Sequence, residues 1–346
     1  MGLIDIIKSK ENVETKEFQE VPAVSKLLRA GLKKIIIPFS DKENKDSYIE
    51  QFDLASRNVE ITLEGLAKLF LNNPIKGLYV MAGLKNWMGE YFTAQKTSSD
   101  KDRFLVYTEA DNAIPFKPEE DIIYTYMMAQ VAFVVNELVD VIPRKGIKHV
   151  AGAFQDANKL AVSVYNEYQT TVPRFLGHKR ISLKIIQATD KPINCCPSLH
   201  ITYSMLLDNV GEMLLDGAAK KDRVMESIRY STLRMFNSVL YTKQHSLLDV
   251  SFGMLCAKMA FEARFNRKFN DLTDTFEAMQ QEHPTIDYGI IEKVYRAGVD
   301  ASNNKSLHEI VGGDLTSNGY LKVKADEDIR NCYFDTKKKE IVKISL

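Results

Sequence analysis

The chain has 346 residues, of which 45% are hydrophobic and 27% charged, a composition that supports a sizeable core and excludes a disordered protein. Its 46 basic residues equal its 46 acidic ones, which excludes a global field that would recruit nucleic acid or an anionic membrane. Any attraction for anions must therefore be local.

The first part of the chain lacks a clear periodicity. Residues 1–60 mix short apolar runs with charged loops, so we expect an N-terminal extension there. Over 61–265 the apolar residues recur mostly at helical spacing, and prolines mark the intervals between the periodic segments. This pattern predicts a helical core with helices over Leu63–Leu71, Gly77–Ala94, Glu120–Val141, Val150–Tyr168, Ser198–Leu215, Lys221–Tyr241 and Ser246–Arg264.

One of these helices is apolar enough to raise the question of a membrane span, which takes about 20 apolar residues. The best candidate, Ile122–Val139, holds Gln130, Asn136 and Glu137, so we expect a buried helix, with a single span as the alternative. Four irregularly spaced cysteines, and a charged Met1–Glu14 without a signal-peptide core, favour a reducing compartment. We therefore expect a cytoplasmic protein, soluble or at most peripheral to a membrane.

The same helix carries an aromatic series, Tyr124, Tyr126 and Phe133. Such a series at helical spacing is more typical of core packing than of a lipid groove. If the helix lines a substrate site, these rings would supply the apolar wall that an acyl or prenyl chain requires.

After Asn266 the character of the sequence changes. Phe276–His283 has a helical pattern, whereas Gly319–Leu346 alternates as strands do, with Asp335-Thr-Lys-Lys as a hairpin turn. Residues 266–346 therefore form an expected C-terminal α+β segment. The fold class that we predict is mainly α, a helical bundle with this small appended segment.

The segment Pro197-Ser-Leu-His200 begins a predicted helix. Proline suits the first helical position, because the N–H group that it lacks would be unsatisfied there anyway. The N–H groups of Ser198, Leu199 and His200 would then lie at a helix N-terminus, where the dipole and free donors favour an anion. A hydroxyl and an imidazole at this end suit a phosphate; a helix cap with a satisfied core histidine is the alternative.

A second histidine lies in Ser238-Val-Leu-Tyr-Thr-Lys-Gln-His-Ser-Leu-Leu-Asp249. His245 and Asp249 are four residues apart, so on a helix their side chains meet. A carboxylate bonded to one ring nitrogen fixes the tautomer and leaves the other nitrogen free to attack, and Lys243 adds a nearby positive charge. A surface His–Asp helix pair is the alternative, although apolar neighbours favour a packed interior.

Together the two segments predict a site for phosphoryl transfer. It would combine a nucleophilic histidine oriented by a carboxylate, a second histidine able to protonate a leaving group, and a helix end that binds the anion.

The same segments resemble the motifs of the type 2 phosphatidic acid phosphatase superfamily, which also contains the vanadium haloperoxidases. Asp190–His200 and Ser238–Asp249 resemble the second and third motifs of a subgroup similar to inositol-phosphoryl-ceramide synthases and related bacterial phosphatases. Upstream, Asp111–Phe116 resembles the Asp-x-x-Ile-Pro-Phe entry to the core, and Tyr168–Arg174 the first motif with its arginine. Order and spacing agree from Asp111 to Gly253.

The resemblance implies an acid-phosphatase/haloperoxidase-like helical bundle and assigns roles. His245 would be the nucleophile that forms a phosphohistidine, Asp249 would orient it, and His200 would be the general acid. No metal or other cofactor is implied, and vanadate would act only as a mimic of phosphate. The phosphate would be held by Arg174, Lys243, Ser198 and the backbone at Leu199, with Asp190, Asn194, Ser238 and Asp111 as supporting residues.

The chain departs from the wider family at three positions. Glu167 stands where the first motif has a lysine, and Val239 where the third motif has an arginine, so Lys243 is the expected substitute. Leu199 replaces the glycine of the common Pro-Ser-Gly-His. The two lost cationic positions disfavour vanadate-dependent halogenation.

The expected function is a phosphatase that hydrolyses a phosphate monoester or diphosphate, including one on a lipid or isoprenoid. The expected partner is this small phosphorylated molecule, with or without an apolar tail, and not a nucleic acid. Two alternatives use the same site, transfer of a phosphorylated head group and processing of a prenyl diphosphate. A third is a non-catalytic helical scaffold that retains an anion pocket. The motifs indicate no oligomeric state.

Overall fold

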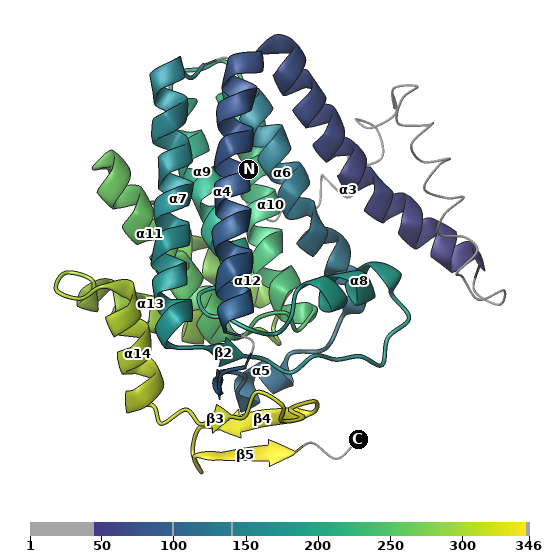
Figure 1. Cartoon of the computed structure of the whole chain (residues 1–346), viewed down its shortest axis with the longest axis vertical. Helices are drawn as coiled ribbons and strands as arrows, with labels where there is room; N and C mark the ends of the chain where they lie inside the picture. The colour runs from purple at the N-terminus through teal and green to yellow at the C-terminus, as the bar shows by residue number, and fades with distance from the viewer. Residues whose placement is uncertain (1–44, 99, 140, 344–346) are drawn as a thin grey trace.

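Figure 1 shows the computed structural model, which describes residues 45–98, 100–139 and 141–343. This part of the chain is mainly helical, which confirms the expected class. Its long helices form a bundle in the upper part of the view, and the strands lie below it. The bundle helices are α3 (Lys45–Asn72), α4 (Pro74–Thr97), α6 (Asp121–Val139), α7 (Arg144–Glu167), α9 (Leu199–Leu214), α10 (Lys221–Tyr241) and α11 (Leu247–Phe265).

These helices lie where the apolar spacing predicts them, but α3, α4 and α7 begin earlier than expected. Helix α3 begins at Lys45, so the expected boundary between residues 60 and 61 falls inside it. Helix α7 begins at Arg144, directly after Pro143, which has the extended backbone of an N-cap. The short helices α5 (Glu109–Ala113), η3 (Pro118–Glu120) and α8 (Ile181–Thr189) connect the long ones. The rest of the expected extension, 1–44, lies outside the described residues.

Helix α9 is the central helix of the bundle. It packs against α6, α7, α10 and α11, and every residue from Ile201 to Gly211 is buried. A helix that is covered on all sides must satisfy its polar groups internally. Thr202 does so through the carbonyls of Ser198 and Gly253, at 2.9 and 3.0 Å.

Gly253 sets how closely α11 approaches the start of α9. A Cβ atom at this position would lie 2.8 Å from the carbonyl oxygen of Ser198 and 3.0 Å from Cβ of Ile201. Since real Cβ atoms do not approach a carbonyl oxygen so closely, only glycine fits without a shift of one helix. The close approach brings together the two helix starts that carry the histidine motifs.

Helix α6, together with η3, is the described segment that is long and apolar enough to cross a membrane, over Pro118–Val139, by length and composition alone. Within its most apolar window 39% of the residues are buried, and the helix packs against α3, α9 and α10. A core helix of a bundle has the same length and composition.

Exposed apolar side chains gather on the α3–α4 hairpin. The most exposed are Leu71, at 84%, and Leu78, at 64%. Further along α4, Met88 and Phe92 are about half exposed. The outer face of α4 is therefore largely apolar.

The C-terminal segment is tied back to the bundle by a strand. β3 (Lys322–Val323) pairs antiparallel with β1 (Arg103–Leu105), which pairs parallel with β2 (Thr170–Thr171). β4 (Cys332–Asp335) and β5 (Glu340–Lys343) form the hairpin expected around Asp335, whose carboxylate accepts hydrogen bonds from the amides of Lys337 and Lys338. The amide of Phe334 donates to the carbonyl of Tyr107 at 2.7 Å.

Three helices precede this sheet, of which the sequence pattern predicted one. Helix α12 (Phe276–Glu282) lies at the expected place, whereas α13 (Tyr288–Ala301) and α14 (Leu307–Ser317) were not expected. They pack against α11 and α7 respectively. The capping residues that mark their N-terminal ends are present in the sequence. The side chain of Asp287 caps α13, and Ser306 forms a capping box with Glu309 on α14.

Candidate active site

The first histidine motif lies at the start of α9, one residue out of the expected register. Helix α9 begins at Leu199 with Ser198 as its N-cap, so Pro197 precedes the cap and is not the first helical residue. The amide of Ser198 donates to the carbonyl of Asp249 at 2.9 Å and is therefore not free for an anion. The amides of Leu199 and His200 belong to the first turn, which has no intrahelical acceptor for them.

The second motif lies at the start of α11, and His245 precedes the helix. Ser246 is the N-cap and forms a capping box: its Oγ accepts from the amide of Asp249 at 3.2 Å, and Oδ2 of Asp249 accepts from the amide of Ser246 at 2.8 Å. His245 and Asp249 are thus not a pair along one helix face. They still meet, with Nδ1 of His245 lying 3.4 Å from Oδ2 of Asp249.

The hydrogen bonds of His245 determine its tautomer. Nδ1 lies 3.1 Å from the carbonyl oxygen of Cys195. A carbonyl only accepts, so Nδ1 carries the proton and Nε2 keeps its lone pair in the neutral ring. Because the His245 ring lines a cavity, the nitrogen that can attack is the one not engaged by the protein.

His200 faces His245 across the same cavity. The two ring centroids lie 5.7 Å apart, with 57° between the ring planes. The ring of Tyr124 also lies against His200, with 3.9 Å between centroids and 32° between the ring planes. The hydroxyl of Tyr124 donates to Oδ2 of Asp190 at 3.3 Å, and Tyr91 donates to Oδ1 at 2.7 Å. This chain of contacts fixes the plane of the His200 ring.

The surroundings of His200 hold it neutral. Burial lowers its pKa to about 3, and the neighbouring His245 and Arg174 act in the same direction, while Asp190 opposes them. At neutral pH the ring therefore carries no proton beyond its N–H group. A general acid must bear the proton that it donates, so His200 can act as an acid only when a further negative charge comes close to it.

Arg174 is the buried cation of this site. Its Nη1 donates to the carbonyls of Lys243 and Gln244, at 3.2 and 3.0 Å, and so holds the loop that precedes His245. Its Nε is buried without a hydrogen-bond partner among the described residues, and the side chain lines the cavity. A guanidinium with spare donors beside two imidazoles is suited to an oxyanion.

Lys243 does not lie among the residues that line the cavity. Its Nζ donates to the carbonyls of Asp111 and Ile114, each at 2.6 Å, and lies 5.3 Å from the centroid of the Tyr107 ring. Burial lowers its pKa to about 8. Lys243 therefore joins the α5 region to the loop that carries His245, which differs from the expected contact with phosphate.

Asp111 strengthens the same junction. Its Oδ1 accepts from the amide of Leu247, the first residue of α11, at 2.7 Å. Its Oδ2 accepts from the amide and the hydroxyl of Thr108, both at 2.8 Å. Burial raises its pKa to about 6. Ser238, also expected to support the site, instead donates to the carbonyl of Glu120 at 2.7 Å.

Three expected residues present unpaired polar atoms at or near the cavity. The hydroxyl of Ser198, Oδ1 of Asp249 and Oδ1 of Asn194 are buried without a hydrogen-bond partner among the described residues. Asn194 lines the cavity and donates through Nδ2 to Ser98 at 3.3 Å. Such atoms are costly to bury. The hydroxyl of Ser198 can donate to an oxyanion, whereas the two Oδ1 atoms only accept and would need a donor on the ligand.

The cavity itself has a volume of about 350 Å³ and two kinds of lining. Its polar end holds Arg174, Asp190, Asn194, His200 and His245. The remainder is mostly aromatic and aliphatic, with contributions from α4, α6 and α8, and consists of Trp87, Met88, Tyr91, Phe92, Tyr124, Met127, Met128, Tyr165, Ile186, Lys191, Ile193, Cys195, Leu199 and Tyr203.

Sequence reasoning missed part of this wall. Trp87 and Tyr91 are one helical turn apart on α4, an aromatic pair visible in the sequence. Tyr124 is buried in the core, as expected, and it also lines the cavity. Tyr126 and Phe133 do not line it. Among the described residues no group of three or more His, Cys, Asp or Glu side chains could hold a metal ion.

The structure also places the two residues that replace cationic positions of the motifs, Glu167 and Val239. Glu167, at the position of the family lysine, is 54% exposed at the end of α7 and lies 3.9 Å from His308, away from the cavity. Val239 is buried in α10, where its carbonyl accepts the amides of Gln244 and His245. Comparison of the chain with models of known protein families, with curated proteins and with solved structures gives no match. The case for a function therefore depends on the geometry of the site.

Proposed function

We propose that the protein is a phosphatase that hydrolyses a phosphate monoester or diphosphate through a phosphohistidine on His245, on a bundle of the acid-phosphatase/haloperoxidase type. One observation carries the proposal: two imidazoles face each other at 5.7 Å between the starts of α9 and α11, beside a buried arginine. The donors available to a tetrahedral oxyanion at this end of the cavity are Nε of Arg174 and the hydroxyl of Ser198, which are both buried without a partner among the described residues.

In the proposed first step, Nε2 of His245 attacks phosphorus in line with the ester oxygen. The new P–N bond forms as the P–O bond breaks, and the leaving oxygen takes its proton from His200. In the second step a water molecule attacks the phosphohistidine, the P–N bond breaks, and His200 receives the proton of the water. His245 is restored, and inorganic phosphate leaves.

The charge of the phosphate is met by few groups. Arg174 supplies the buried positive charge, and the first-turn amides of Leu199 and His200 add the partial charge of a helix N-terminus. Asp249 keeps Nδ1 of His245 protonated by its proximity and favours the imidazolium character that develops there. The carbonyl of Cys195 holds the same Nδ1–H group in place.

The direct test is hydrolysis of an aryl phosphate with release of inorganic phosphate. Vanadate should inhibit it competitively, and it should raise the melting temperature, because a ligand bound by the native state alone stabilises that state. Arg174→Lys keeps the charge but loses the planar fork, so it should weaken vanadate binding about tenfold or more. Arg296→Lys, an exposed pair partner of Glu292, is the matched control. If the wild type neither hydrolyses the aryl phosphate nor binds vanadate, the proposal is wrong.

A second test concerns the proton of His200. Sulfate is a tetrahedral dianion that does not itself titrate near neutrality, so any proton uptake on its binding belongs to the protein. We expect uptake of up to about one proton per sulfate near pH 6, because the bound charge raises the pKa of His200. Calorimetric titrations in two buffers with different ionisation enthalpies give this number. His200→Gln should remove the uptake; uptake that persists in this variant would assign it to another group.

A further inference from the structure

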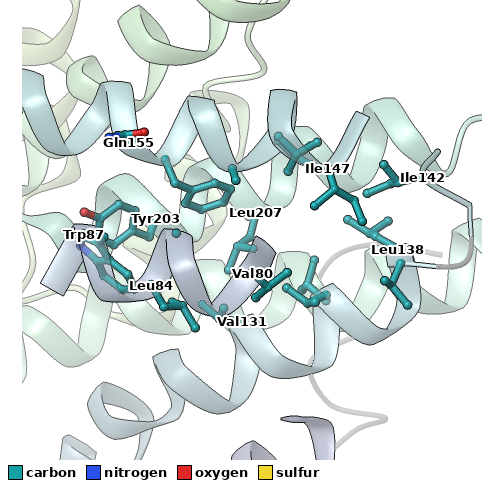
Figure 2. A pocket seen from close by; sticks show the side chains of 18 residues that line it. Val80, Leu84, Trp87, Val131, Leu138, Ile142, Ile147, Gln155, Tyr203 and Leu207 are labelled. Carbon is teal, nitrogen blue, oxygen red and sulfur yellow. The ribbon is translucent and has the colours of Figure 1, made fainter. Parts of the chain in front are cut away.

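A second cavity lies behind the aromatic wall of the catalytic one. Figure 2 shows its lining, which comes from α4, α6, α7, α9 and the connection between α6 and α7. The volume that the lining surrounds is about 110 Å³. We call this cavity the apolar chamber. Its lining consists of Val80, Gly83, Leu84, Trp87, Val131, Val134, Val135, Leu138, Val139, Ile142, Ile147, Val150, Ala151, Phe154, Gln155, Tyr203, Leu207 and Val210.

The chamber lining is apolar with few exceptions. Gln155 is the one amide or charged side chain in it, and Figure 2 shows this residue at one end. Tyr203, another lining residue, turns its hydroxyl toward Asn158, at 3.3 Å. A cavity with so few polar groups does not hold ordered water well, because a water molecule needs two or more polar partners.

The chamber and the catalytic cavity share two residues, Trp87 and Tyr203. Their rings are in edge-to-face contact with 4.5 Å between centroids. The chamber and the catalytic cavity therefore adjoin at this pair of rings. Met128 lines both the catalytic cavity and a smaller void that adjoins the chamber at Val131 and Val135.

The chamber is partly open, since Val80, Leu84 and Phe154 in its lining are only half-buried. An unfilled apolar hollow still needs an explanation, because the atoms around it lose contacts that a close-packed interior would give them. The position of the chamber next to the catalytic cavity provides an explanation. An anion site opens on one side of the Trp87–Tyr203 pair and an apolar chamber lies on the other, an arrangement that is complementary to a molecule with a phosphate at one end and hydrocarbon at the other.

We propose that the apolar chamber binds the hydrocarbon chain of the substrate, and that the substrate is a single-chain alkyl or prenyl monophosphate. The inference rests on the proposed function for the position of the phosphate. The small volume favours one chain over the two of a diacyl lipid. Each methylene group that enters should raise the affinity roughly fourfold, by the usual free energy of its burial.

A homologous series tests the proposal. With linear alkyl phosphates from butyl to dodecyl, and prenyl phosphates beside them, we expect kcat/KM to rise with chain length and then level off when the chamber is full. The branched and linear series need not level off at the same length, and their comparison shows which chain the chamber fits. A flat profile with active enzyme would overturn the chamber and leave the phosphatase proposal in place.

Two glycines on α4 provide a matched pair of variants. A Cβ atom at Gly83 has Ala151 as its one close neighbour, at 3.8 Å, so a leucine there would grow into the chamber. A Cβ atom at Gly89 meets nothing within 4 Å, and this position is exposed. Gly83→Leu should lower kcat/KM for the long substrates about tenfold or more and leave an aryl phosphate unaffected. Gly89→Leu should change neither.

Binding of alkyl sulfates separates this inference from the proposed function. Suppose that the wild type hydrolyses no phosphate ester but binds decyl sulfate more tightly than ethyl sulfate, and that Gly83→Leu removes this difference. The chamber would then be supported as a chain site, and the proposed phosphatase function would be wrong. If decyl and ethyl sulfate bind equally to the wild type, the chamber is not a chain site, whatever the enzyme does.

Discussion

His245→Ala should abolish hydrolysis of an aryl phosphate, with a loss on the order of 10⁴-fold or more, as is usual when a nucleophile is removed. No neighbour can replace it, because the other imidazole of the cavity, His200, lies against Tyr124 and belongs to α9. Initial rates give the loss, and the phosphohistidine can be trapped with labelled substrate under alkaline conditions, where it persists. The variant should yield no trapped label.

His200→Ala should behave differently in the same assays. It should still form the phosphoenzyme, and its rate should suffer least with a nitrophenyl leaving group, which needs little protonation, and most with an alkyl one. His308→Ala is the histidine control, since this side chain lies on α14 and is 37% exposed. Full activity of His245→Ala, or the same leaving-group dependence in both histidine variants, would contradict the assigned roles.

Asp111→Ala should be the most destabilising single change near the site, on the order of 3 kcal/mol in the free energy of unfolding. It would leave the amides of Thr108 and Leu247 buried without their acceptor. Urea unfolding at neutral pH measures the change. Asp328→Ala, at an exposed surface pair, should change the stability by less than about 0.5 kcal/mol. Equal effects of the two substitutions would mean that Asp111 does not join α5 to α11.

The pH dependence of the free energy of unfolding gives an independent test of the raised pKa of Asp111. Burial raises its pKa from 3.8 to about 6, so between these values the folded state binds the proton more tightly than the unfolded chain does. The stability from this group is therefore complete below pH 4 and is lost as the pH rises through 6, by on the order of 3 kcal/mol. Asp111→Asn cannot titrate. Its stability relative to the wild type should improve from pH 4 to pH 7, and a constant difference would contradict the shift.

His200 changes stability in the opposite direction over the same window. Its folded-state pKa of about 3 lies below the ordinary value of 6.5, so the unfolded chain binds the proton more tightly and stability rises with pH between the two. The two contributions overlap in the wild type. Comparison with Asp111→Asn separates them, because His200 titrates in both proteins.

The bundle was largely predictable because apolar spacing reports burial directly. The seven long helices lie where this spacing places them, whereas the short helices α5 and α8 were not expected. The local geometry of the second motif was not predictable from spacing, since two residues four apart meet both along a helix and across its first turn. The capping box of Ser246 and Asp249 was the signal that places His245 before the helix.

Lys243 and Tyr124 show two further limits of spacing. Lys243 was assigned to phosphate by its charge and its place in the motif, but its backbone has a positive φ of 55° and its Nζ reaches the carbonyls near α5. A hydropathy pattern does not predict that a single residue adopts a left-handed backbone conformation. Tyr124 follows the helical period of a core residue and still lines a cavity, because periodicity shows which face is inward and not whether the interior is filled.

The loop between α10 and α11 has an unusual property for a connecting segment. Every residue from Thr242 to Ser246 is buried, and the loop is held by Arg174, by Lys243 and by two amides on the carbonyl of Val239. Folding thereby holds in place the nitrogen of His245 that we propose as the nucleophile, so little reorganisation would be left for the proposed reaction. In small-molecule systems such prior alignment corresponds to effective molarities of about 10⁵ M or more. The rate of the proposed reaction should therefore depend on the rigidity of this loop more than on the strength with which the substrate is bound.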